Sequence, residues 1–174
     1  MTGLTMRDAR PEDRAAIEDV TISAYQEYAP IMHERWEIYR HSILGTLADV
    51  RPADQIVAES GDVIVGTVLL FPAGTAFKAP GGVDVSLAAP EIRLLAVAPA
   101  ARGLGVGAAL VNECMRRARL AGVSAITLHT TDMMQVAMRM YERMGYVRAP
   151  ELDFSPAPEF VIKGYRYTLA AAPQ

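Results

Sequence analysis

The chain has 174 residues, of which 51% are hydrophobic and 21% charged. This length and composition predict one domain with a substantial buried core and exclude intrinsic disorder as the main state. The formal net charge is −3 at pH 7, so no net positive field draws nucleic acid or anionic lipid, and we expect neither as a partner.

The N-terminal part predicts a strand, two helices and a hairpin. Leu4–Arg7 reads as a short strand. A helix is expected over Pro11–Tyr28, because proline and acids occupy its first turn and apolar residues follow at helical spacing. Ile31–Ala48 carries an apolar stripe at three- and four-residue steps, which predicts a second helix. Gln55–Glu59 and Val63–Phe71 are joined by turn residues and predict an antiparallel hairpin.

The second half of the chain begins with a glycine- and proline-rich segment, Pro72–Pro90, which has no sustained period. We expect a long loop or a partly ordered insertion there. The elements expected after it are a strand over Glu91–Val97, a helix over Gly105–Ala121, a strand over Ser124–Thr130, a helix over Met133–Met144 and a strand over Phe160–Leu169. The last residues, Ala170–Gln174, are expected to fray.

The alternation of strands and helices predicts the fold class. Central strands that alternate with helices are parallel and covered by those helices. No internal repeat and no linker between two halves is visible in the sequence. We expect a single α/β domain over residues 1–174, with a mixed central sheet and helices on both faces.

The cysteine content and the apolar runs bear on the compartment. One cysteine, Cys114, makes no internal disulfide framework, which fits a reducing compartment. The first residues lack the apolar stretch of a secretory signal. The run Val63–Phe71 is far shorter than the roughly 20 residues of a membrane helix. The expected location is cytoplasmic, without membrane contact.

The sharpest feature is the segment Pro99–Gly107, which lies between an apolar strand and an amphipathic helix and holds glycines at 103, 105 and 107. Glycines let successive main-chain N–H groups point into one concavity, and the start of a helix adds unpaired N–H groups. Such a turn suits a phosphate or diphosphate, and Arg102 adds charge at the same place. The alternative is a tight strand-to-helix connection that needs glycine for geometry alone.

Two known phosphate motifs were compared with this turn. Gly103-x-Gly105-x-x-Ala108 formally fits the dinucleotide pattern, with Asp132 downstream. In that fold the glycines follow the first strand directly and many βα units come after them, whereas here five residues separate Val97 from Gly103 and little chain follows. The P-loop pattern fails because no Gly-Lys-Ser/Thr follows the glycines.

At these residues the chain resembles the GCN5-related N-acetyltransferase (GNAT) family. The acetyl-CoA signature of that family, Gln/Arg-x-x-Gly-x-Gly/Ala after a strand, matches Arg102–Gly107, and Ala137–Tyr146 resembles its second motif. The resemblance extends over most of the chain and implies that the strand Glu91–Val97 splays from the following strand at a bulge. One departure is Met134, which stands where the family often has an asparagine that bonds the pantetheine arm of CoA.

The resemblance implies a site for acetyl-CoA as cosubstrate. Main-chain N–H groups of the turn would bind the diphosphate, and strand residues would pair with pantetheine. The cofactor-binding residues expected in this way are Leu95, Ala96, Val97, Arg102, Gly103, Leu104, Gly105, Val106, Gly107, Ala108, Met134 and Tyr141.

The catalytic residues expected from the resemblance are Leu95, Glu91 and Tyr141. The N–H of Leu95 would donate to the developing oxyanion from about 3 Å. Glu91, four residues earlier, would accept the proton of the amine, directly or through a water. Tyr141 would protonate the departing thiolate. The alternatives are a solvated or ion-paired strand residue for Glu91 and a tyrosine at the edge of the core for Tyr141.

Other conspicuous residues have structural interpretations. No histidine shows metal-ligand spacing, and the proposed chemistry requires no metal. His129 ends a strand beside the expected cleft and is a second candidate base. Cys114 lies on an apolar helix face, where burial is expected. Tyr25, Tyr28 and Trp36 either pack the N-terminal helices or contact the acceptor.

The resemblance implies an enzyme that transfers acetyl from acetyl-CoA to a primary amine, for which we expect a small molecule as acceptor. A peptide N-terminus or lysine is the first alternative, and a non-catalytic CoA-binding module is the second. Relatives often form dimers, so a homodimer is an open possibility. The sequence does not identify the amine.

Overall fold

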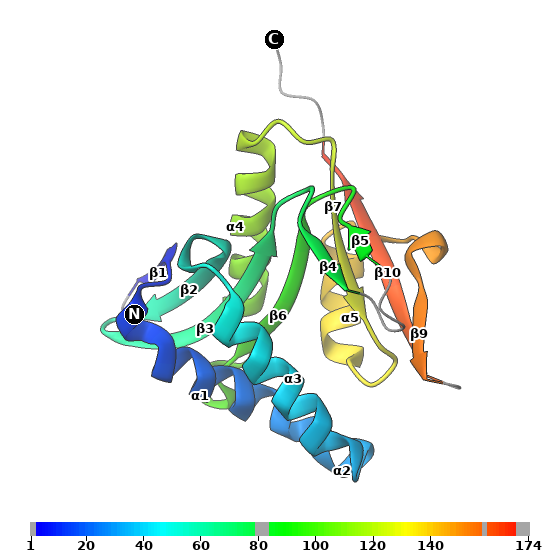
Figure 1. Cartoon of the computed structure of the whole chain (residues 1–174). Coiled ribbons are helices and arrows are strands. Elements are labelled where there is room, and N and C mark those ends of the chain that lie inside the picture. Colours follow the sequence, from blue (N-terminus) through cyan, green and yellow to red (C-terminus); the bar gives the residue numbers. More distant parts are fainter. Residues whose placement is uncertain (1–2, 79–83, 158–159, 170–174) are drawn as a thin grey trace. The chain divides into compact units, whose positions relative to one another are not determined.

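The computed structural model describes residues 3–78, 84–157 and 160–169 (Figure 1). The expected fraying of Ala170–Gln174 lies outside the described residues. Contacts divide the chain into two compact units, one made of Met1–Leu69 with Leu94–Glu113 and the other of Leu70–Arg93 with Cys114–Gln174. The single domain expected over residues 1–174 therefore stays a prediction.

The first unit contains the N-terminal elements. These are β1 (Leu4–Asp8), α1 (Arg14–Tyr25), α2 (Ala29–Met32), α3 (Arg35–Asp49), β2 (Gln55–Ser60) and most of β3 (Val63–Phe71), with short 3₁₀ helices at Pro11–Asp13, Gln26–Tyr28 and Pro52–Asp54. It also holds the end of β6 (Glu91–Val97), a 3₁₀ turn at Pro99–Ala101 and the start of α4 (Val106–Leu120).

The expected hairpin is present at the centre of this unit. β2 pairs antiparallel with β3, with Gln55 opposite Leu69, and β1 pairs antiparallel with the other edge of β2. Five hydrophobic residues of the hairpin are 0% exposed, namely Ile56, Val57, Ala58, Val68 and Leu69. Both faces of the hairpin are therefore covered, which explains why its strands are almost continuously apolar.

The second expected helix, Ile31–Ala48, is interrupted in the structure. α2 ends at Met32, and His33 adopts a φ of 50°, a left-handed conformation that no helix continues through. α3 then buries one stripe, formed by Trp36, Ile43 and Leu47. The apolar spacing alone does not reveal the break, because both helices present apolar residues to the same unit.

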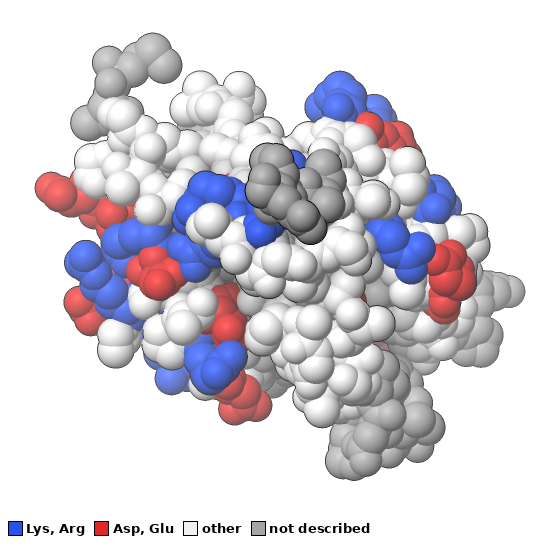
Figure 2. Space-filling view, turned by 90° about the horizontal axis from the view of Figure 1, so that it is seen from above, with Lys and Arg blue, Asp and Glu red and all other residues white. Residues whose placement is uncertain are grey.

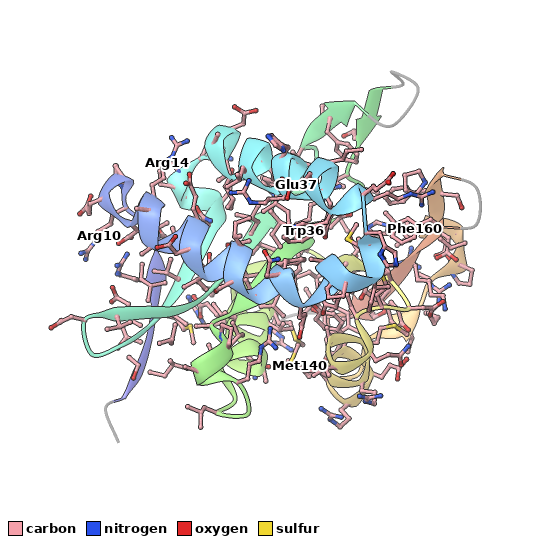
Figure 3. The ribbon with its side chains drawn as sticks, turned by 90° about the horizontal axis from the view of Figure 1, so that it is seen from below. Arg10, Arg14, Trp36, Glu37, Met140 and Phe160 are labelled. Atoms are coloured by element: carbon pink, nitrogen blue, oxygen red, sulfur yellow. The ribbon has the colours of Figure 1, made fainter. Side chains whose placement is uncertain are left out.

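Gly66 of β3 fixes how closely α4 approaches the hairpin. A Cβ at Gly66 would lie 2.8 Å from Cγ1 of Val106 and 3.0 Å from Cδ1 of Leu110. In the first unit, the start of α4 lies on one face of the strands, and α1 and α3 lie on the other (Figures 1 and 3). The packing at Gly66 thus positions the N-terminus of α4.

The second unit contains the remaining elements. These are β4 (Ala76–Lys78), β5 (Asp84–Ser86), the start of β6, the end of α4, β7 (Ala125–Thr130), α5 (Gln135–Arg143), β8 (Val147–Arg148), β9 (Phe154–Ala157) and β10 (Phe160–Thr168), with a 3₁₀ turn at Pro150–Leu152. β8 and β9 are absent from the sequence-based prediction, because two- to four-residue strands carry no readable period.

The glycine- and proline-rich segment Pro72–Pro90 is more regular than expected. β4 and β5 pair antiparallel in a separate two-stranded sheet, with Phe77 opposite Val85. Of the two expectations for this segment, the partly ordered insertion agrees with these strands, and the long loop does not. Three-residue strands are too short to show alternation in the sequence.

The central strands of the second unit form a mixed sheet, as the sequence predicts. β6 pairs parallel with β7, placing Glu91 opposite Thr127, and β10 pairs antiparallel with β7. β8 and β9 both pair antiparallel with β10. Ile126, Leu128 and Tyr165 are almost fully buried here. The expected mixed α/β fold is confirmed.

Candidate functional site

The glycine turn of the first unit has the backbone that its sequence predicts. Gly103 and Gly105 have φ values of 75° and 81°, a left-handed region that side chains rarely adopt. An added Cβ at either position would meet no atom within 4 Å. Conformation, and not packing, therefore requires glycine at these two positions.

This turn exposes a continuous row of main-chain donors. Among the residues that the structure describes, none accepts a hydrogen bond from the N–H groups of Gly103–Ala108, whereas the next one, of Ala109, donates to the carbonyl of Gly105 at 3.0 Å. Three of these donors belong to the turn and three to the first turn of α4, where the helix dipole is positive. The arrangement suits an anion with several acceptor oxygens, such as a diphosphate.

The guanidinium of Arg102 has protein partners, so it is not reserved for an anion bound at the turn. Its Nη1 lies 2.7 Å from Oε2 of Glu27, and its Nη2 donates to the carbonyl of Ala24 at 3.0 Å. Its main-chain N–H donates to the carbonyl of Pro99. The side chain therefore ties the glycine turn to the end of α1, a role that the sequence did not predict.

The strand before the turn is irregular at one residue. Leu94 has a φ of 47° in the middle of β6, which is rare for a branched side chain. The parallel ladder joins Glu91 to Thr127 and Ile92 to Leu128, and it ends two residues before Leu94 within the described chain. This irregularity matches the bulge that the resemblance implies.

The residues after the irregularity belong to the first unit with the turn. Leu95 and Val97 are half-buried and Ala96 is buried. The N–H of Ala98 donates to the carbonyl of Val65, which holds the end of the strand against β3. The structure therefore brings Leu95–Val97 and the glycine turn into the same compact unit.

Glu91 is the best buried acid among the described residues of the second unit, with a side chain that is 3% exposed. Oε1 accepts from Nε of Arg93, two residues along the same strand. Oε2 lies 3.2 Å from Nδ1 of His129 on β7, and Nε2 of His129 lies 2.9 Å from the carbonyl oxygen of Leu152. The ion pair agrees with the alternative interpretation of Glu91 as an ion-paired strand residue, but the side chain is buried and not solvated.

These contacts determine the charge states. Burial by itself raises the pKa of Glu91, but the contact with His129 and the charge of Arg93 outweigh it and hold that pKa below its usual range. For His129, burial by itself lowers the pKa, and the contact with Glu91 outweighs it and raises that pKa. These shifts favour the carboxylate form of Glu91 and the protonated form of His129, whose two ring nitrogens both lie near acceptor oxygens.

Arg93 is held by more than Glu91. Its guanidinium carbon lies 4.6 Å from the ring centroid of Phe77 on β4 and 5.7 Å from that of Phe71 at the end of β3. Arg93 is missing from the sequence-based site. A signal for it exists, since charges at positions 91 and 93 share one face of an otherwise apolar strand.

Tyr141 lies on α5 and is buried, with 5% of the residue exposed. Its ring centroid is 5.8 Å from that of Tyr146. Met134, at the N-cap of the same helix, is half-buried. Tyr141, Met134, Glu91 and His129 are thus all in the second unit, whereas Leu95 and the glycine turn are in the first.

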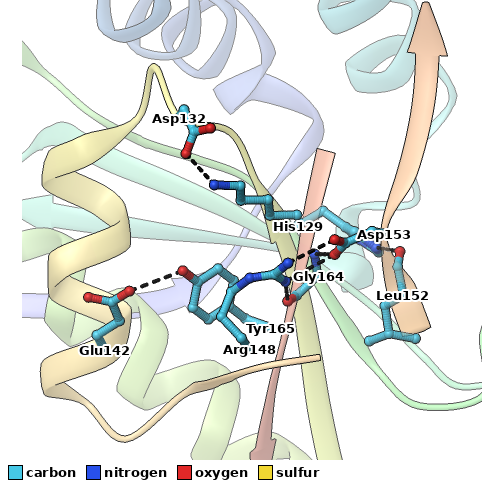
Figure 4. Close-up of polar contacts among 9 residues, drawn as sticks. His129, Asp132, Glu142, Arg148, Leu152, Asp153, Gly164 and Tyr165 are labelled. Carbon is cyan, nitrogen blue, oxygen red and sulfur yellow. Dashed lines mark hydrogen bonds and ion pairs between the residues drawn. The ribbon is translucent and has the colours of Figure 1, made fainter. Parts of the chain in front are cut away.

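A polar network that the sequence did not predict follows β10 in the second unit (Figure 4). Arg148 pairs with Asp153 at 2.7 Å, Asp153 accepts from the N–H of Gly164, and Lys163 pairs with Asp132. His129 joins it through Leu152, which adjoins Asp153. The network holds in place the segment whose Leu152 carbonyl lies next to Nε2 of His129.

The conspicuous aromatic residues of the N-terminal helices contact one another. Tyr25 is edge-on to Tyr28 and Tyr39 with 6.0 Å between centroids, and Trp36 is edge-on to Tyr39. Tyr25 and Trp36 are buried. These contacts agree with the interpretation as helix packing.

Cys114 is fully buried, as expected.

A cavity of roughly 180 Å³ lies in the first unit beside the start of α1. Arg10 and Arg14 line it and lie at that end of the helix (Figure 3). Arg14 pairs with Glu18 at 3.0 Å. None of the candidate site residues lines this cavity.

Three further properties of the described residues bear on partners. No group of three His, Cys, Asp or Glu among them is arranged to hold a metal ion. None of their helices has the length and apolar character that crossing a bilayer requires. On the face in Figure 2, basic residues lie beside acidic ones without a large region of one sign.

The comparisons with known proteins agree with this geometry. The family model described as "Acetyltransferase (GNAT) family" matches residues 10–146. A mouse protein, "Probable N-acetyltransferase family 8 member 5", is 37% identical over 94 residues, which is 53% of this chain and 37% of that protein. The chain spans about two fifths of the length of the curated relatives it matches.

Solved structures with the same fold include two with a bound coenzyme. The PaiA N-acetyltransferase of Thermoplasma acidophilum, in complex with coenzyme A, has a TM-score of 0.66 at 16% identity and covers 95% of this chain and 99% of its own. A GNAT family acetyltransferase of Brucella melitensis, in complex with acetyl-CoA, has a TM-score of 0.59 at 20% identity, covering 100% and 94%.

Proposed function

The chain belongs to the GNAT family of acetyltransferases, and from this premise we propose that it transfers the acetyl group of acetyl-CoA directly to a primary amine of a small molecule. The observation that carries the proposal is the row of free main-chain N–H groups at Gly103–Ala108, which the diphosphate of CoA would satisfy.

The residues proposed to bind acetyl-CoA are those that the family resemblance implies. The turn and the start of α4 bind the diphosphate, and the main chain after Leu94 pairs with the pantetheine arm. The residues assigned to acetyl-CoA are Leu95, Ala96, Val97, Arg102, Gly103, Leu104, Gly105, Val106, Gly107, Ala108, Met134 and Tyr141. Met134 contributes an apolar contact only, because a thioether is a weak acceptor and donates no hydrogen bond.

The proposed reaction is direct transfer. The lone pair of the amine forms a bond with the thioester carbonyl carbon, and the N–H of Leu95 donates to the resulting oxyanion. Collapse breaks the carbon–sulfur bond, and Tyr141 gives its proton to the leaving thiolate. Glu91 accepts the excess proton of the amine through a water, which leaves an N-acetyl amine and CoA.

The structure of the Glu91 cluster supports part of this assignment. A base must be ionised, and a carboxylate with 3% exposure would lose its charge without partners. Arg93 and His129 supply them. The same contacts lower its basicity, so Glu91 suits proton transfer from the acidic N–H of the tetrahedral intermediate better than from a free ammonium ion.

Calorimetry with CoA and acetyl-CoA tests the proposed binding site. Gly103→Asp places an anion beside the row of donors and should weaken CoA binding at least about 10-fold, because charge repulsion replaces attraction. Gly74→Asp is the matched control, since Gly74 has a φ of 83° and equally open surroundings. Equal affinities of both variants and the unmodified chain would contradict the assignment.

Thioester consumption with amines and with peptides separates the alternatives. Turnover with a small amine supports the proposal, and turnover with peptides alone supports a protein acetyltransferase. Tight CoA binding without turnover supports a binding module. A homodimer and a cytoplasmic location also stay proposals, which sedimentation and cell fractionation test.

A further inference from the structure

Arg93 has donor groups that the fold does not use. Its Nε donates to Glu91, and within the described part of the chain no residue accepts from its two terminal nitrogens. The side chain is 31% exposed, and its terminal nitrogens are not among the buried atoms that lack a partner in the described chain. A guanidinium presents its terminal donors in a fixed plane, which matches the two oxygens of a carboxylate.

The orientation of this guanidinium is set by its neighbours. Phe77 and Phe71 lie against it at 4.6 and 5.7 Å, and Glu91 holds its Nε. Three contacts on a flexible side chain reduce the conformational entropy that is lost when a ligand binds. Arg93 is therefore preorganised for a ligand, unlike the arginines that are fully exposed at the surface.

The charges of the cluster favour an anionic ligand. Glu91 contributes one negative charge and Arg93 one positive charge, and the raised pKa of His129 favours a second positive charge beside them. Both oxygens of Glu91 are already engaged by these cations. A second ammonium group on an acceptor would find no free acid in this cluster.

Arg93 precedes Leu95, the proposed oxyanion donor, by two residues in the chain. We propose that the free donors of Arg93 bind a carboxylate of the acceptor, so that the preferred acceptor is an amine that also carries a carboxylate, as a free amino acid does. This inference rests on the proposed function and assigns Arg93 as its specificity-determining residue.

The test uses matched acceptors that differ only in the carboxylate. Acetyl transfer is measured with glycine, leucine, phenylalanine and lysine, and with their four carboxamides. The expected kcat/KM is at least about 10-fold higher for the acids. In Arg93→Met, which keeps an apolar stem against the phenylalanines, the ratio of acid to amide should fall about 10-fold. Comparing ratios between variants cancels the different basicities of the amines.

Arg166→Met is the matched control, because Arg166 pairs with Glu151 in the same unit and has no contact with the cluster in the described residues. It should keep the acid-to-amide ratio of the unmodified chain. Arg93→Lys keeps the charge without the planar pair of donors and should retain only part of the preference. An acid-to-amide ratio that Arg93→Met leaves unchanged would overturn the proposal.

A second measurement separates this inference from the proposed function. Calorimetry of the CoA-bound protein with N-acetylphenylalanine and with its carboxamide requires no turnover. Binding of the acid that weakens about 10-fold in Arg93→Met supports the carboxylate site even if no acetyl transfer occurs. Equal binding of acid and amide refutes it, while acetyl transfer to uncharged amines would leave the proposed function standing.

Discussion

Tyr141 and Tyr146 lie side by side in the second unit, with ring centroids 5.8 Å apart and 59° between the ring planes. If Tyr141 is the general acid, Tyr141→Phe should lower kcat by about 100-fold, within the range of such catalysis, and change the Kd for acetyl-CoA little. Steady-state kinetics and calorimetry measure the two effects.

Tyr146→Phe serves as the control for that prediction. The hydroxyl of Tyr146 is buried and has no partner in the described part of the chain. Removing it should leave kcat unchanged and stability equal or slightly higher, because an unsatisfied buried hydroxyl costs free energy. Equal losses of kcat in both variants would assign the effect to packing and remove Tyr141 from the mechanism.

His129 gives a prediction on pH and stability. The pKa of His129 is raised in the folded chain above the ordinary 6.5. Its contribution to the free energy of unfolding is therefore complete below about pH 6.5 and is lost as the pH rises through the pKa of the folded chain. Because the pKa of Glu91 is lowered, its contribution to the free energy of unfolding is complete above about pH 4.5, its ordinary pKa, and is lost as the pH falls through the pKa of the folded chain. The pair is therefore most stabilising between these values.

The variant His129→Gln measures this contribution. It should reduce the free energy of unfolding by about 1–3 kcal/mol near pH 5.5, because a buried carboxylate loses a charged partner. The loss should be smaller at pH 9, because the stability that comes from a raised histidine pKa decreases as the pH rises. Urea denaturation at both pH values provides the comparison. A loss that is the same at both, or larger at pH 9, contradicts the ionised pair.

Among the elements, β3 and α4 depend on one glycine. Gly66→Val should destabilise the chain by about 1–3 kcal/mol, since the new side chain begins at a Cβ only 2.8 Å from Val106. Gly45→Ala in α3 meets no atom within 4 Å and should stabilise by up to about 1 kcal/mol. Thermal unfolding of both variants tests the pair, and a neutral Gly66→Val would show that α4 can move away.

The boundaries of an element can be predicted from the sequence only where its apolar residues repeat at a regular spacing. β6 is observed over Glu91–Val97, as predicted, because seven mostly apolar residues lie between clear breaks. The 3₁₀ turn at Gln26–Tyr28 and the left-handed His33 escape prediction, because each depends on backbone angles that no apolar spacing encodes. The pairing of β4 with β5 escapes for a different reason, since a short ladder is stabilised by contacts distant in sequence.

For the whole molecule, the prediction of one domain can be tested by calorimetry. One domain should unfold in a single transition whose calorimetric and van't Hoff enthalpies agree. Acetyl-CoA at about 100 times its Kd should stabilise the folded chain by about 2.7 kcal/mol and raise Tm by roughly 5–10 °C. Two separate transitions would assign the units Met1–Leu69 with Leu94–Glu113 and Leu70–Arg93 with Cys114–Gln174 as independent domains.

The sequence by itself determined the mixed fold, the family and the glycine turn. The fold class and the turn depend on local properties, namely the spacing of apolar residues and the left-handed angles that only glycine adopts readily, whereas the family follows from the resemblance of two short motifs. The candidate residues Glu91 and Tyr141 could also be named from short motifs, although their roles stay proposals.

Only the tertiary structure decided the surroundings of Glu91. Its partners come from positions 93, 129 and, through His129, 152, which belong to different elements. The same holds for Arg102, whose partners on and after α1 are more than 70 residues away in the chain. Burial and charge pairing depend on which distant segments meet, and a carboxylate keeps its charge in a nearly dry position only when such segments supply cations.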